Sequence, residues 1–175
     1  MTLQLPEYWL RGPLPHIITL LQPAAHAMLQ AQWELHQLFE NFDDRLLWDT
    51  PADNASPAFH LQHITGFLDR LFTYAKGEEL TNEQLVYLSN EGTASTAITG
   101  ESLLKNLDKQ IEISIRFLET IQVGNLTEVR YVGRKKIQST TIGLLFHAAE
   151  HMTRHTGQLL VTVKMIKNKF EFSYQ

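Results

Sequence analysis

Three of the eight histidines in this 175-residue chain are spaced by four residues, at His147, His151 and His155. On an α-helix a spacing of four turns through about 400°, so neighbouring imidazoles share one face and lie roughly 6 Å apart along the axis. A buried polar group without a partner costs about 1–3 kcal/mol, and a metal ion would satisfy two such imidazoles at once. The last two histidines fall on a stripe that should face a core: Leu144, Ala148, Leu159, Thr162 and Ile166.

A His-x-x-x-His spacing is only moderately specific, because eight histidines often produce one by chance. The plain alternative is a pair of hydrogen-bonded core histidines or a wet helix face. A second group, His60 and His63, lies on another expected helix and strengthens the metal interpretation. Three neutral imidazoles would leave a fourth ligand position open for water, which is the arrangement of catalytic metal sites. The absence of the glutamate of His-Glu-x-x-His argues against a zinc peptidase.

The bulk composition limits the partners. A hydrophobic content of 43% with 19% charged residues is typical of a folded protein, and the net charge of −4 argues against nucleic acid as a partner. The chain has no cysteine, which removes disulfides and thiolate ligands and fits a reducing cytosol. Neither a secretory signal nor an apolar run of about 20 residues is visible, so we expect a cytoplasmic protein without a membrane partner.

Proline, glycine and capping residues divide the chain into helical segments. Pro23 is accepted only in the first turn of a helix, Ser56 can cap a helix that has Pro57 at its first position, and Gly77 can end that helix. The expected elements are an irregular segment at 1–15, helices at about 23–42, 57–76, 81–91, 96–121 and 141–168, and a tail at 169–175 that is extended or strand-like.

Four of these segments are long and amphipathic, and no convincing sheet is visible, although residues 127–132 alternate weakly. We therefore expect an all-α fold, an antiparallel four-helix bundle formed by residues 1–175 as one domain. The long stretch around residues 43–56 and the elements after Gly77 leave room for a crossover connection, so simple up-down order is not assured.

Two stretches carry a family resemblance. Ser56-Pro-Ala-Phe-His-Leu-Gln-His63-Ile-Thr-Gly-Phe-Leu-Asp-Arg70 and Leu144-Leu-Phe-His-Ala-Ala-Glu-His151-Met-Thr-Arg-His155-Thr-Gly-Gln158, together with Tyr74-Ala-Lys-Gly77, resemble the DinB-like superfamily of DinB/YfiT type. The resemblance implies a four-helix bundle that is often dimeric. It also implies a divalent metal held by one histidine of the second helix and a His-x-x-x-His pair of the last, which here are His63, His151 and His155.

Neighbouring residues have less specific interpretations. His60 could substitute for His63 or orient it, and His147 is expected beside the site or simply packed near it. Arg70 and Glu150 could line the pocket, but ion pairs on helix surfaces are the favoured expectation for both, and Glu91 is expected to end a helix.

The expected function is that of a divalent-metal-dependent enzyme with an open position for water or a thiolate. Hydrolysis and transfer of a small thiol onto an electrophile are both open, and some members of the resembled family are thiol S-transferases or isomerases. Zinc and nickel lead the expected metals, with manganese and iron as further candidates. The expected partners are a small-molecule substrate, such as a low-molecular-weight thiol, and a second copy of the chain. The alternative is a non-catalytic dimeric bundle that binds a metal or ligand.

Overall fold

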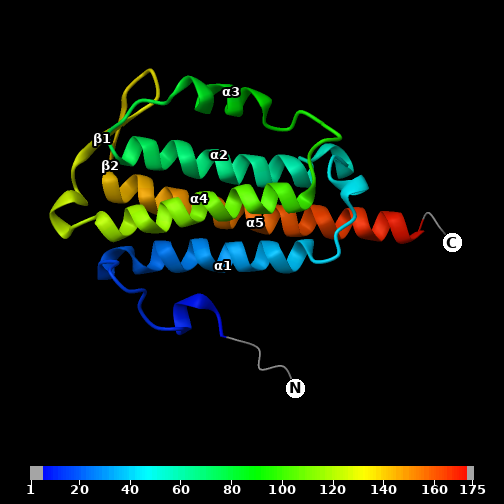
Figure 1. The fold of residues 1–175 in the computed structure, drawn as a ribbon, viewed down its shortest axis with the longest axis horizontal. Coiled ribbons are helices and arrows are strands. Elements are labelled where there is room, and N and C mark those ends of the chain that lie inside the picture. Colours follow the sequence, from blue (N-terminus) through cyan, green and yellow to red (C-terminus); the bar gives the residue numbers. More distant parts are fainter. Residues whose placement is uncertain (1–5, 173–175) are drawn as a thin grey trace.

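The computed structural model of the protein describes residues 6–172, and these form five α-helices and one small two-stranded sheet. The long helices α1 (Gln22–Phe39), α2 (Pro57–Ala75), α4 (Gly100–Thr120) and α5 (Thr141–Phe172) lie side by side (Figure 1). Helices α1 and α2 each pack against both α4 and α5. The fold is therefore mostly helical.

The direction of the chain is clear from its colours in Figure 1. Helix α2 runs opposite to α1, α4 runs in the same direction as α2, and α5 returns in the direction of α1. The connection from α2 to α4 must therefore travel back along the length of the helices. It carries α3 (Asn82–Asn90), which packs against α2.

The helix starts follow the capping residues of the sequence. Ser56 accepts a hydrogen bond from the Phe59 amide, and Pro57 occupies the first helical position of α2, as predicted. Helix α4 starts at Gly100 rather than near residue 96, because Thr99 and Ser102 form a reciprocal capping box there.

A β-hairpin precedes α5, and the sequence did not predict it as a sheet. Strand β1 (Val129–Val132) pairs antiparallel with β2 (Ile137–Thr140), joined by a turn in which Gly133 and Lys136 have positive φ angles. The strands are too short for a clear alternation of apolar and polar residues, so the sequence predicts only a weakly extended segment at the first of them. Arg130 Nε donates to the Ala75 carbonyl at 2.7 Å, which ties the hairpin to the end of α2.

The C-terminal tail was predicted wrongly. Helix α5 continues to Phe172 instead of ending near residue 168, because residues 167–172 contain neither glycine nor proline to stop it. Residues 173–175 lie outside the described part of the chain, as do residues 1–5 of the expected irregular N-terminal segment. The rest of that segment contains only the 3-10 turn Tyr8–Leu10.

One apolar core joins the four long helices. Leu35 of α1, Leu68 of α2, Leu107 of α4 and Leu145 of α5 are fully buried. The stripe predicted for the last helix is buried in full: Leu144, Ala148, Leu159, Thr162 and Ile166. Among residues 6–172, none of the helices combines the length and apolar character needed to cross a membrane.

Candidate metal centre

The contact between α2 and α5 brings three histidines together. One ring nitrogen from each of His63, His151 and His155 lies within 4.8 Å of the others. His63 Nε2 is 3.0 Å from His151 Nε2, and the ring centre of His155 lies 4.6 Å from that of His63 and 4.5 Å from that of His151. The structure thus places side by side the three residues that the sequence suggests as ligands.

These distances fit a common ion. Two imidazole nitrogens that are each 2.0–2.1 Å from a tetrahedral zinc lie about 3.3–3.4 Å apart. The observed separation of 3.0 Å between His63 Nε2 and His151 Nε2 is close to this value. His63 and His151 are therefore spaced as two ligands of one divalent cation, and a nitrogen of His155 lies within 4.8 Å of both.

A carboxylate holds His63 in place. His63 Nδ1 lies 2.7 Å from Glu91 Oε2, and the Phe59 ring stacks on the imidazole with an angle of 9° between the planes. An ionised carboxylate can only accept, so Nδ1 carries the proton and Nε2 presents its lone pair to His151.

Glu91 is in turn bound by Arg70, whose Nη1 donates to Oε1 at 2.7 Å. The Arg70 and Glu91 side chains are only 9% and 4% exposed, so the expectation of a surface ion pair at Arg70 is wrong. The sequence carried no signal for this contact. Glu91 follows a short helix and lies 28 residues beyond His63, where only its role at the helix end was visible.

His60 and His147 have different positions. His60 is buried, and its Nδ1 lies 3.1 Å from His155 Nδ1, so it contacts the cluster through His155 and can orient that ring. The His147 side chain is 49% exposed and lies 3.3 Å from Glu150 Oε2. Its ring centre is 5.5 Å from that of His151, but it is not one of the three clustered residues. Glu150 also pairs with Arg154 on the helix surface, which confirms the prediction for Glu150.

Burial affects the protonation of three of these histidines. Desolvation, reinforced by neighbouring histidines, lowers the pKa of His60, His151 and His155 to about 4. These imidazoles are therefore neutral near pH 7, as metal ligation requires.

His151 has spare binding capacity. Its Nδ1 is buried, and no hydrogen-bond partner for it lies within residues 6–172. Its Nε2 faces the lone pair of His63 Nε2. Either His151 Nε2 donates there and leaves a buried lone pair at Nδ1, or two lone pairs face each other. A cation at the cluster would accept both facing lone pairs and so remove the repulsion between them.

A cavity of 580 Å³ opens beside the cluster, with His60 and His155 in its wall. It is of a size that suits a small organic molecule. None of the described residues that line it is acidic. Its apolar part comes mainly from Phe59, Val161 and Met165.

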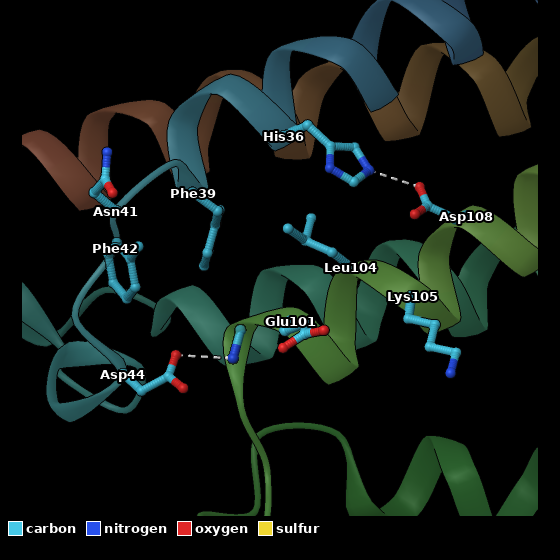
Figure 2. Close-up of a pocket in the computed structure, with 10 residues that line it drawn as sticks. His36, Phe39, Asn41, Phe42, Asp44, Glu101, Leu104, Lys105 and Asp108 are labelled. Atoms are coloured by element: carbon cyan, nitrogen blue, oxygen red, sulfur yellow. Dashed lines mark hydrogen bonds and ion pairs between the residues drawn. The ribbon is translucent and has the colours of Figure 1, made fainter.

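A second cavity, of 610 Å³, lies between the end of α1 and the start of α4 (Figure 2). In its wall, His36 Nε2 contacts Asp108 Oδ1 at 2.8 Å, and Asp44 accepts from the Gly100 amide at 2.9 Å (Figure 2). It lacks a clustered set of ligand atoms like that of the three histidines. Among residues 6–172, the group of side chains that could hold a metal ion is the one on α2 and α5.

The sequence matches the DinB superfamily over residues 27–159, which is more than half of the chain. Among curated proteins none matches. Two solved structures share the fold. A conserved protein from Enterococcus faecalis has a TM-score of 0.67 at 14% identity, covering 86% of this chain and 99% of its own. A protein from Streptococcus pneumoniae has a TM-score of 0.59 at 13% identity, covering 83% and 88%.

The metal-free protein should lose stability as the pH falls from about 6.5 to about 4. The unfolded chain binds protons first in this window, because burial has lowered the pKa of His60, His151 and His155 only in the folded state. Urea unfolding of the stripped protein above and within this window measures the effect. His60→Gln should reduce the pH dependence, and a variant that matches the unaltered protein throughout would contradict this explanation.

Proposed function

The chain belongs to the DinB superfamily, and on that premise we propose that it is a divalent-metal-dependent enzyme whose ion is held by His63, His151 and His155. The observation that carries the proposal is the meeting of three ring nitrogens within 4.8 Å. An ion held by three protein ligands keeps a fourth position open, as catalytic zinc sites do. The adjacent cavity of 580 Å³ gives a small molecule room to reach it.

The donor types favour zinc or nickel over manganese. Imidazole suits zinc, nickel and iron, whereas manganese prefers carboxylate and carbonyl oxygens. The three clustered residues are all histidines, and the nearest carboxylate, Glu91, points both of its oxygens at other side chains.

When bound, such an ion supplies Lewis acidity, which lowers the pKa of a water or thiol at the open position. The protein would then act as a hydrolase or as a transferase of a small thiol. Phe59, Val161 and Met165 would bind the organic part of the substrate in the cavity, and His60 would keep the His155 ring in place.

For the fold we propose an antiparallel four-helix bundle in which the α2–α4 connection is the crossover, the whole chain being one domain. The support is that α1 and α2 each pack on both α4 and α5, and that the apolar core is shared by all four helices.

We also propose that the protein is a homodimer. Trp9 and Phe146 are 63% and 65% exposed, and both border shallow cavities that share Pro23, Ala27 and Thr153 on the α1–α5 face. An exposed apolar surface of this kind often marks an interface. Sedimentation at micromolar concentration should give twice the chain mass, and a monomer mass would count against the pairing.

Purified protein loaded with zinc or nickel should turn over esters, amides or pairs of a small thiol and an electrophile. Activity should vanish in His155→Ala and return when metal is restored to stripped protein. A metal-loaded protein that is inactive on all these classes would instead favour the second function, a non-catalytic metal- or ligand-binding module.

Replacing His155 with alanine should weaken zinc binding by more than about 100-fold, whereas His147→Ala should cost no more than about 10-fold. His155 lies within the cluster, but His147 is half exposed and faces Glu150. Competition titration with a chelator measures both. Equal losses of zinc affinity in the two variants would contradict the assignment of His151 and His155 as the ligand pair of the last helix.

A further inference from the structure

We propose that Glu91, fixed by Arg70, is a positioning residue that sets the tautomer and orientation of His63. The inference rests on the proposed function, in which His63 binds a metal. One carboxylate bridges two donors: Oε2 lies 2.7 Å from His63 Nδ1, and Oε1 accepts from Arg70 Nη1 at 2.7 Å. Both oxygens are thus committed, and the side chain is almost fully buried.

The backbone around Glu91 is held against α2 on both sides. Tyr87 donates its hydroxyl to the Gln62 carbonyl at 3.1 Å, and the Gly92 amide donates to Gln62 Oε1 at 2.8 Å. Glu91 therefore reaches His63 from a fixed segment of the α2–α4 connection.

Gly66 provides the space for this approach. A Cβ at Gly66 would lie 2.6 Å from Glu91 Oε1, 2.6 Å from the Tyr87 ring and 2.7 Å from Arg70 Nη1. Its backbone is ordinary helix, so the glycine serves the close packing of these side-chain ends and not a special φ angle. The end of α3 can come this close to α2 because the position lacks a side chain.

The electrostatics explain why the bridge has this composition. A buried carboxylate is stable only if it is paired, and Arg70 provides the charge. The acceptor then fixes the proton of His63 on Nδ1, so that Nε2 keeps the lone pair directed at the cluster. The loss of such a partner lowers metal affinity by roughly 10–100-fold.

Glu91→Gln tests the proposal with a near-isosteric change. The amide has one acceptor oxygen, and Arg70 always donates, so the amide oxygen should remain with Arg70 and the amide nitrogen should face His63 Nδ1. His63 must then carry its proton on Nε2, where the lone pair is no longer available. In metal-free protein, ¹⁵N NMR of the imidazole should show Nδ1–H in the unaltered protein and Nε2–H in Glu91→Gln.

Zinc affinity gives the second readout. Competition with a chelator should show binding that is about 10–100-fold weaker in Glu91→Gln and unchanged in Glu83→Gln, which removes an exposed carboxylate from the same connection. Gly66→Ala should also weaken binding, because its Cβ displaces the pair while both charges remain, and it serves if Glu91→Gln does not fold.

The outcomes separate the two proposals. An unaltered protein that binds neither zinc nor nickel nor manganese would overturn the proposed function together with this inference. The role of Glu91 alone would be overturned by a different set of results. In that case the unaltered protein binds zinc normally, Glu91→Gln has unchanged affinity and an unchanged His63 tautomer, and Gly66→Ala has unchanged affinity.

Discussion

The antiparallel contact between α2 and α5 is the interaction on which the site depends. Because the two helices run in opposite directions, His60 meets His155 and His63 meets His151. Apolar neighbours on the same stripes, such as Ile64 and Ala148, are buried in the shared core and keep the helices together. Burial of apolar surface therefore positions polar groups that would not associate by themselves.

The same packing buries histidine nitrogens that need hydrogen-bond partners, and only some of them have one among the described residues. Desolvation keeps His60, His151 and His155 neutral, which suits ligation but places unprotonated nitrogens close together. His63 is oriented by Glu91 and His155 by His60, whereas His151 Nδ1 has no partner among residues 6–172. Glu91 and His60 thus hold the rings of His63 and His155, and the three clustered histidines could bind a cation.

Patterns local in sequence predicted the helices and the His151/His155 pair, because periodicity, caps and the four-residue spacing are short-range signals. The choice of His63 over His60 came from the family resemblance. The Glu91–Arg70 bridge was not predictable from them: it depends on how the α2–α4 connection folds back and on the missing side chain at Gly66. The hairpin was missed because each of its strands has only four residues, which is too short for a clear alternation of apolar and polar residues. The extension of α5 was missed because the alternation of Phe170 and Phe172 is typical of a strand. Residues 167–172 contain no glycine or proline that would end the helix.

The metal content of the protein tests the central claim most directly. Protein purified without a metal-affinity column, incubated with zinc, nickel or manganese and freed of excess ion, is submitted to elemental analysis. The account predicts about one divalent ion per chain, with zinc or nickel retained in preference to manganese, and a loss of that ion in His151→Ala. A chain that remains empty after all three incubations would contradict it.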